Sequence, residues 1–174
     1  MSNIPENLGR TGSVADFHAI SKVTAGQVLG LIEAIDEVGG TADVATISQE
    51  VDMDVDRLGP VLNAAEFLGL LAVEDGDVRM TDLSKKLLHA NVRDRKSILR
   101  EVIDDIPVFR MVLDMARQSG RPLERREVLE AITARIGSHQ SDDLFKALVY
   151  WGRYVELLRY DSGSEQVRLR TPTK

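Results

Sequence analysis

Two distant segments of the sequence share one pattern of helix and hairpin, and this repeat limits most strongly how the chain can fold. An offset of 86 residues places Leu58 on Leu144, at matching positions of an apolar helical stripe. The same offset places Leu71 on Leu157, where each segment changes from helical spacing to short alternating strands. We therefore expect two similar units, each a set of helices followed by a hairpin.

The first unit is expected over residues 23–91, where three helices precede a hairpin. Thr24 and Gln27 have the spacing of a capping box, so they predict the start of the first helix. Pro60 is expected in the first turn of the third helix, because an interior proline loses an amide hydrogen bond. Asp56 is then the expected cap of that helix. This order of elements is typical of a winged helix.

The rest of the chain divides around this unit. Residues 1–22 have little periodicity and are interpreted as a flexible N-terminal arm. Residues 92–120 predict a connecting helix that is kinked near Pro107. Residues 121–174 predict the second unit. The expected fold class is mainly α with short β-hairpins, in which tandem winged-helix-like units are joined by a long helix.

Composition limits the functions open to this chain. Of 174 residues, 43% are hydrophobic and none is Cys, so thiolate catalysis and Cys-ligated metal centres are excluded. No apolar run is long enough to span a bilayer, so we expect no membrane insertion, and we take the cytoplasm as the default location. The net charge is −6, with 6 basic and 15 acidic residues in 1–91 but 16 and 13 in 92–174. An acidic first half disfavours a nucleic-acid coat there.

The sequence offers no group of residues with catalytic spacing. It has no Gly-x-x-x-x-Gly-Lys-Ser/Thr loop to hold phosphates. Its three histidines, at 18, 89 and 139, lack partners at the spacing of helical metal ligands. We therefore expect no catalytic residue, no metal site and no cofactor, and we interpret the protein as a non-enzyme.

If the chain binds DNA, the second unit carries the basic residues for it. The candidates lie on its last helix and its hairpin, and they are Lys146, Arg153, Arg159, Arg168 and Arg170. Strand alternation places Leu169 toward the core, between two of these arginines. The alternative, which we favour, is that Arg153 and Arg159 pair with the nearby Glu156 and Asp161.

A second basic run begins the connecting helix. Arg93, Lys96 and Arg100 share one helix face, at spacings of three and seven residues. Such a face could hold acidic lipid or nucleic acid. The more ordinary interpretation is a solvated face, or one that meets the acidic first unit.

Three aromatic residues cluster near the end of the last helix. Trp151 aligns with an apolar stripe and is expected in the core, although the cluster could also stack a nucleobase. Tyr150 and Tyr154 are expected to be half exposed, and they are the candidate anchors for a protein partner.

Several short motifs together resemble a known family. They are Trp151–Asp161, Val28–Glu33 with Gly39-Gly40, Leu68–Leu70 with Glu74–Gly76, and Ile106-Pro107. Their order and spacing over residues 23–171 resemble the AAA-associated C-terminal domain. That domain is usually the tail of ATP-binding subunits of nitrate, sulfonate or bicarbonate-type ABC transporters. The ATPase itself is missing from this sequence, and the initial Met1 favours a stand-alone homologue over a fragment.

The resemblance implies a non-catalytic regulatory or adaptor module that binds a protein partner. The implied partner is the ATPase or permease of an ABC-type importer, which would place the protein at the membrane only through that partner. One alternative is a winged-helix transcription regulator that binds DNA as a dimer through the second unit. Another is a purely structural domain for homodimerisation. Small-ligand sensing where the two units join is neither supported nor excluded.

Overall fold

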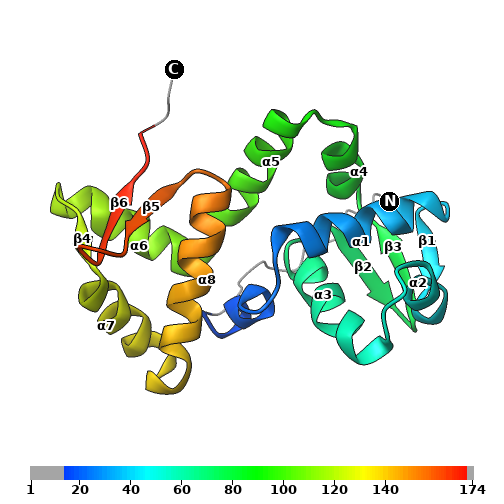
Figure 1. The fold of residues 1–174 in the computed structure, drawn as a ribbon, viewed down its shortest axis with the longest axis horizontal. Helices are drawn as coiled ribbons and strands as arrows, with labels where there is room; N and C mark the ends of the chain where they lie inside the picture. The colour runs from blue at the N-terminus through cyan, green and yellow to red at the C-terminus, as the bar shows by residue number, and fades with distance from the viewer. Residues whose placement is uncertain (1–13, 172–174) are drawn as a thin grey trace, which may run out of the picture.

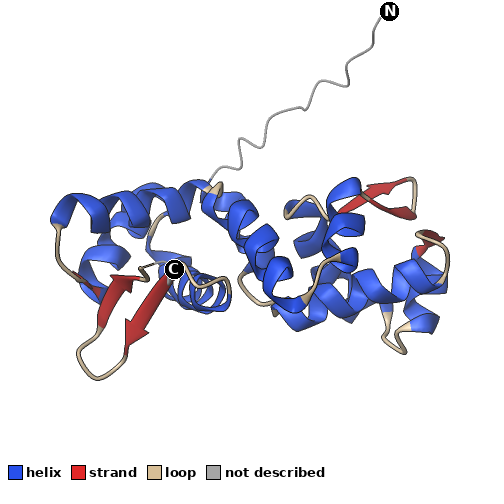
Figure 2. Cartoon of the chain, turned by 90° about the horizontal axis from the view of Figure 1, so that it is seen from above, coloured by secondary structure: helices blue, strands red, loops and turns tan. Residues whose placement is uncertain are grey.

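Two similar sets of elements, each built on a three-stranded antiparallel sheet, lie at opposite ends of an elongated molecule (Figure 1). The structure is a computed structural model, which describes residues 14–171. The described chain is mainly helical, with short strands only in the two small sheets, so the expected mainly α fold class with short β-hairpins is confirmed. Viewed from above, the two sheets lie far apart, and helices fill the space between them (Figure 2).

Unit one comprises the elements from the first helix to the end of the first hairpin and the helix that follows it. They are α1 (Ala25–Glu37), β1 (Thr41–Asp43), α2 (Val44–Glu50), α3 (Val55–Phe67), β2 (Leu71–Glu74), β3 (Asp77–Met80) and α4 (Asp82–His89). The strand order is β1-β3-β2, with Val78 opposite both Ala42 and Val73. The predicted capping box of α1 is confirmed, because Gln27 N donates to Thr24 Oγ1 at 3.1 Å and Thr24 N donates back to Gln27 Oε1.

Unit two repeats this plan. Its elements are α6 (Pro107–Ser119), β4 (Leu123–Glu124), α7 (Arg125–Ile136), the 3₁₀ helix η2 (Ser138–Gln140), α8 (Ser141–Tyr154), β5 (Leu158–Asp161) and β6 (Gln166–Leu169). The strand order β4-β6-β5 is that of unit one, with each strand in the corresponding place.

Matching hydrogen bonds fix the register between the two units. After α3, Leu70 N donates to Ala65 O at 2.9 Å, and after α8, Leu157 N donates to Gly152 O at 2.8 Å. The offset between equivalent residues is therefore 87 here, and the expected 86, which placed Leu71 on Leu157, was wrong by one. Apolar residues adjoin one another along both helices, so a slip of one position still aligned apolar with apolar.

The connection between the units is two helices, α5 (Val92–Asp104) and α6, where the sequence predicted one kinked helix. Pro107 occupies the first position of α6, where the missing amide hydrogen costs nothing, and Ile106 before it is extended. The chain therefore turns at this proline. Helix α6 packs against β4 and β6, so it corresponds to α1 of unit one.

The segment Val14–Ile20 forms a 3₁₀ helix, η1, which corrects the expected flexible arm for residues 14–22. Phe17 is fully buried and lies edge-on to Phe109 of α6, with 5.4 Å between the ring centroids. Ile20 O accepts a hydrogen bond of 3.0 Å from Trp151 Nε1. Such a short helix gives no periodicity to detect in the sequence. Residues 1–13 of the expected arm lie outside the described residues.

Helix α3 begins two residues earlier than expected. Arg57 N donates to Asp54 Oδ1 at 2.9 Å, so Asp54 is the cap, and the prediction of Asp56 was wrong. Pro60 then lies in the second turn of the helix. Gly59 allows this, because a residue without a Cβ avoids much of the clash that a proline imposes on the residue before it.

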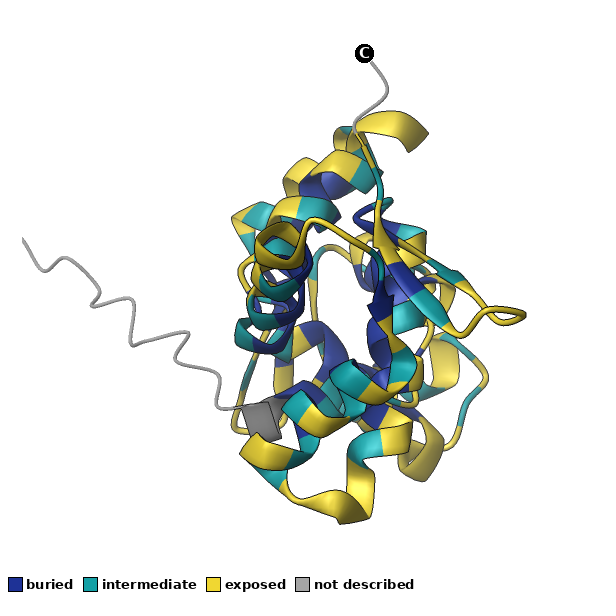
Figure 3. Ribbon diagram, turned by 90° about the vertical axis from the view of Figure 1, so that its left-hand side faces the viewer, coloured by how far each residue is buried: buried dark blue, intermediate teal, exposed yellow. Residues whose placement is uncertain are grey.

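Burial follows the apolar stripes of the helices. In each unit the buried residues line the inner faces of the helices and one face of the sheet, and the outer faces are exposed (Figure 3). Trp151 is the largest fully buried side chain. No helix within residues 14–171 is both long and apolar enough to cross a membrane.

Candidate interaction site

Four of the predicted nucleic-acid residues are exposed on unit two. Lys146 and Arg153 lie two turns apart on α8. Arg159 of β5 and Arg168 of β6 are direct partners in the hairpin register. Like charges placed opposite each other on neighbouring strands destabilise a hairpin unless an anion lies nearby. The structure thus brings these four residues to one helix and the hairpin that follows it.

The fifth residue, Arg170, is separated from the others because it pairs with Glu156, Nη1 to Oε1, at 3.0 Å. The predicted pairing of Arg153 with Glu156 was therefore wrong. The predicted pairing of Arg159 with Asp161 was also wrong, since no ion pair of the described residues includes Arg153 or Arg159.

Asp161 has a local role at the tip of the hairpin. Its Oδ1 accepts hydrogen bonds from Ser164 N and from Gly163 N, at 3.2 and 2.8 Å. These bonds from Ser164 and Gly163 lower the pKa of Asp161, because they stabilise the charged form. The carboxylate therefore shapes the turn, and the charge of Arg168 on the neighbouring strand lowers the pKa of Asp161 further.

Leu169 does not face the core as predicted, since 36% of its surface is exposed. It is the last residue of β6, whereas Val167 on the same strand face is buried. Leu169 and Arg168 line a cleft of about 350 Å³ together with Arg121. The guanidinium of Arg121 is already engaged by Glu127 at 2.7 Å.

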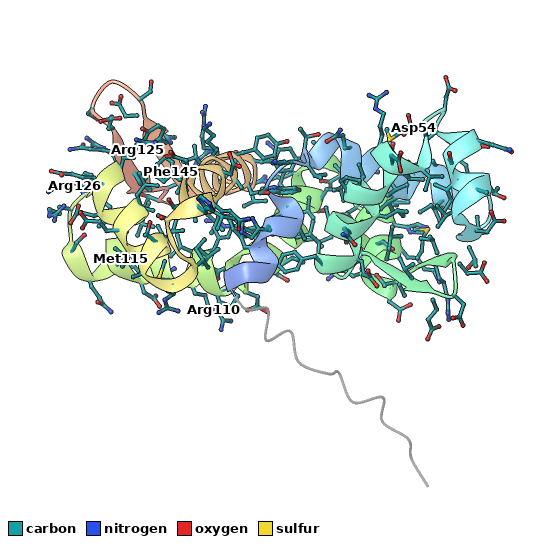
Figure 4. All side chains as sticks on the ribbon, turned by 90° about the horizontal axis from the view of Figure 1, so that it is seen from below. Asp54, Arg110, Met115, Arg125, Arg126 and Phe145 are labelled. Atoms are coloured by element: carbon teal, nitrogen blue, oxygen red, sulfur yellow. The ribbon has the colours of Figure 1, made fainter. Side chains whose placement is uncertain are left out.

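Helix α8 is held firmly against α7 on the side away from unit one. The guanidinium of Arg125 lies 5.3 Å from the ring centroid of Phe145, and its Nη2 donates to Asp142 Oδ1 at 2.7 Å. Figure 4 shows Arg125 and Phe145 together at this end of the molecule, with Asp54 at the other. The basic residues of α8 are thus presented by a fixed helix.

The aromatic cluster on α8 joins the two units. Trp151 is buried as predicted, and its Nε1 bond to Ile20 fixes the N-terminal segment. Tyr150 keeps 38% of its surface exposed. Its hydroxyl oxygen nevertheless accepts a hydrogen bond of 2.9 Å from the backbone N–H of Ala25, the first residue of α1. Tyr154 is half buried, and its burial, with Tyr150 nearby, raises the pKa of its hydroxyl. The two tyrosines stack with 6.5 Å between centroids.

A basic cleft of about 610 Å³ lies between α5 and the end of unit two. The predicted basic face of α5, formed by Arg93, Lys96 and Arg100, lines one side. Glu156 and Arg170 line the other. Sequence reasoning found the helix face but missed Arg170 as its neighbour, because nothing local links residues so far apart.

Unit one carries an apolar groove between α1 and α3. It has a volume of about 270 Å³, and most of its lining is apolar, including Leu31, Met53 and Val61. Gly26 and Gly30 leave the α1 side open, and a Cβ at Gly30 would meet nothing within 4 Å. This groove was not predicted, although two glycines four residues apart on a helix were a visible signal.

Within the described residues, no group of three or more His, Asp or Glu side chains is placed to hold a metal ion. His89 ends α4, and its Nδ1 lies 2.6 Å from Lys85 O. This contact with a carbonyl of the last turn gives His89 a local role at the helix C-terminus.

The sequence profile of one family, described as the C-terminal AAA-associated domain, matches residues 45–161. That span is about two thirds of the chain and runs from α2 to the end of β5. The chain belongs to this family. The match confirms the expected resemblance, over a shorter stretch than the expected 23–171. Neither the curated proteins nor the solved structures contain a match.

The family assignment and the described surfaces give complementary information. Membership of the C-terminal AAA-associated domain family links the chain to AAA or ABC-type ATPases at the level of association. The structure adds three places on which an association could act: the cross-strand arginine pair of the second hairpin, the basic cleft beside α5, and the apolar groove of unit one.

Proposed function

We propose that this protein is a non-catalytic regulatory or adaptor module, and that its partner is the ATP-binding subunit or the permease of an ABC-type importer. Membership of the C-terminal AAA-associated domain family carries the proposal, since the family is named for its association with ATPases. The protein would then act in the cytoplasm and reach the membrane only through its partner.

The apolar groove of unit one is the proposed docking surface. The core of a stable interface is mostly apolar and contains few charged residues. The lining of the groove likewise includes no charged side chain. Gly30 is exposed, and its missing side chain leaves room above Leu31 and Val61. A partner segment could therefore place an apolar side chain against the helix backbone.

The charge of the surrounding unit indicates the chemistry of that segment. Residues 1–91 carry 15 acidic and only 6 basic residues. Acidic side chains such as Asp54 and Asp56 begin α3, one wall of the groove. We therefore expect the partner to present an apolar segment flanked by Lys or Arg, because complementary charge speeds and orients docking.

The test is affinity purification of the tagged chain from its own cells, with mass spectrometry of the bound proteins. Gly30→Leu fills the groove and raises helix propensity, so the fold is retained. Ala134→Leu is the matched control, since it adds the same side chain on an exposed face of α7. The wild type and the control should recover an importer ATPase or permease, and Gly30→Leu should lose most of it.

Two other outcomes would overturn parts of this proposal. Recovery of no importer component by the wild type would reject the partner. A wild type that is dimeric in gel filtration and a Gly30→Leu variant that is monomeric would make the groove a homodimer interface. The purified chain should also hydrolyse no ATP, and a hydrolysis rate that follows the protein through purification would reject the non-catalytic role.

The alternative function is DNA binding through unit two, favoured by the cross-strand pair Arg159 and Arg168. Binding through these residues should weaken steeply with salt and fall in Arg159→Ala/Arg168→Ala. The control is Arg126→Ala/Arg135→Ala, which removes the same charge from α7. Affinity that is equal in both variants would reject the hairpin as a DNA-binding element.

A further inference from the structure

We propose that the basic cleft beside α5 binds a small phosphorylated molecule that carries two or three negative charges. This inference goes beyond the adaptor role and does not depend on which partner is bound. The cleft volume of about 610 Å³ lies within the range of small-ligand sites, roughly 300–1,000 Å³.

The lining of the cleft is strongly basic. Four cationic side chains line the cleft against one acidic side chain, in a protein whose net charge is −6. The cations are Arg93, Lys96, Arg100 and Arg170, and the acid is Glu156. Since Glu156 already pairs with Arg170 at 3.0 Å, three positive charges have no opposing charge in the lining. A ligand with two or three negative charges would balance them.

The three cations of α5 have few contacts within the protein. Lys96 Nζ lies 5.7 Å from the centroid of the Tyr154 ring, which is a weak interaction with a neutral group. Neither Arg93 nor Arg100 belongs to any ion pair among the described residues. Lys96 and Arg100 are half buried, and partial burial of an unpaired charge costs free energy. An anion in the cleft would remove that cost.

Contacts away from the cleft hold α5 in place. Arg95, on another face of the helix, pairs with Glu33 of α1 at 3.3 Å and donates to Leu88 O and Ala90 O. The buried face, which includes Leu99 and other aliphatic residues, packs into the core. Helix α5 is therefore fixed by residues that do not line the cleft, so the backbone that carries its three cations is in place before any ligand arrives.

The lining also explains why an organic phosphate fits better than a bare ion. Val92 stands at the cleft with 75% of its surface exposed, and Val155 lies among the lining residues. Arginine binds phosphate oxygens with two parallel hydrogen bonds, and Ser97 adds a hydroxyl. The cations would hold the phosphates, and the exposed Val92 would contact the organic part of the ligand.

The location gives the site a consequence. One wall is the helix that leads from unit one, and the other is the end of α8 and of β6 in unit two (Figure 1). A bound anion would attach α5 to unit two through charges on both sides. Ligand binding should therefore stabilise this joint against unfolding.

The experiment is calorimetric titration of the full chain with pyrophosphate, ADP and ATP, and a parallel sedimentation assay with phosphatidylcholine vesicles that contain phosphatidylglycerol. The first arm detects a soluble ligand, and the second detects a lipid phosphate. The variant is Arg93→Gln/Arg100→Gln, and the matched control is Arg126→Gln/Arg135→Gln on α7. The wild type and the control should bind in one arm, and the variant should bind at least about tenfold more weakly there.

A second measurement separates binding from folding. Without ligand, the variant should melt at or above the wild-type temperature, because it removes charges that have no acidic partner in the described chain. With ligand, only the wild type and the control should show a raised melting temperature. Failure of the wild type to bind any probe in either arm would overturn the proposal, as would equal affinity of the variant and the wild type.

Discussion

Units one and two share a backbone plan but use it in opposite ways. Both have the same strand order, and both leave the long helix through the same set of hydrogen bonds. Unit one is acidic and has an apolar groove, whereas unit two carries the cross-strand arginine pair and forms one wall of the basic cleft beside α5. The comparison teaches that the fold is set by the backbone pattern, and that the surface side chains decide what each copy can bind.

The clearest internal difference lies at one pair of equivalent positions. Where α3 has Ala64 and Ala65, α8 has Trp151 and Gly152. The tryptophan reaches the N-terminal segment at Ile20, and the glycine lets Leu158 of β5 approach the helix closely. Unit two thus gains a large side chain and loses a small one next to it.

The largest expected effect comes from Trp151→Ala, which gives unit two the residue that unit one has. It should lower the free energy of unfolding by about 3–5 kcal/mol, because it removes a fully buried side chain and the anchor of Ile20. Urea denaturation followed by far-UV circular dichroism measures this, since the variant loses the only tryptophan.

A companion variant separates packing from hydrogen bonding. Trp151→Phe keeps most of the apolar volume but leaves the carbonyl of Ile20 without its donor, at an expected cost of about 1–3 kcal/mol. A cost for Trp151→Ala of a few tenths of a kcal/mol would show that the attachment of the N-terminal segment does not depend on α8.

The next effect is expected from Gly152→Ala, again toward unit one. The added Cβ would lie 2.6 Å from Leu158 Cγ, and Leu158 is itself buried, so overpacking should cost about 1–3 kcal/mol. The reciprocal control Ala65→Gly creates no clash in α3. If the clash is the cause, Gly152→Ala/Leu158→Ala should cost less than the sum of the single changes in urea denaturation.

Local spacing predicted much of the fold, and long-range contacts explain what it missed. The Thr24–Gln27 capping box and both hairpins depend on residues close in sequence, so their patterns were visible. The burial of η1 depends on Phe109, and the basic cleft depends on Arg170, which is remote from α5. Neither contact leaves a periodic trace in the sequence.

A smaller effect is expected from Tyr150→Phe. It keeps the stacked ring but removes the hydroxyl that accepts a hydrogen bond from Ala25 N. The free energy of unfolding should fall by about 0.5–1.5 kcal/mol. Unit one has no equivalent bond, because Asn63 stands at this place on α3 and is exposed. Asn63→Ala is therefore the control and should change the urea midpoint little. An equal shift of the urea midpoint for both variants would mean that the hydroxyl does not stabilise the contact between α8 and α1.

The smallest expected effect concerns the hydrogen bonds that begin the second helix of each unit. Helix α2 is capped by Asp43, whereas in α7 the Glu127 carboxylate accepts from Glu124 N and pairs with Arg121. The Arg121 guanidinium, with the backbone amide of Glu124, lowers the pKa of Glu127 from 4.5 to about 2. Because the folded pKa is the lower one, the charged carboxylate stabilises the fold above about pH 4.5, and this is lost as the pH falls toward 2.

Glu127→Gln tests this, because its amide oxygen can still accept from Glu124 N while the pairing with Arg121 loses its charge. The wild type should melt at a higher temperature than the variant at pH 6, and the difference should shrink between pH 4.5 and 2 as Glu127 is protonated. Glu130→Gln is the control on the same helix, since its contact with Arg126 is long and exposed at 3.8 Å. A melting difference that stays constant from pH 6 to pH 2 would mean that the shape of the side chain, and not its charge, holds the start of α7.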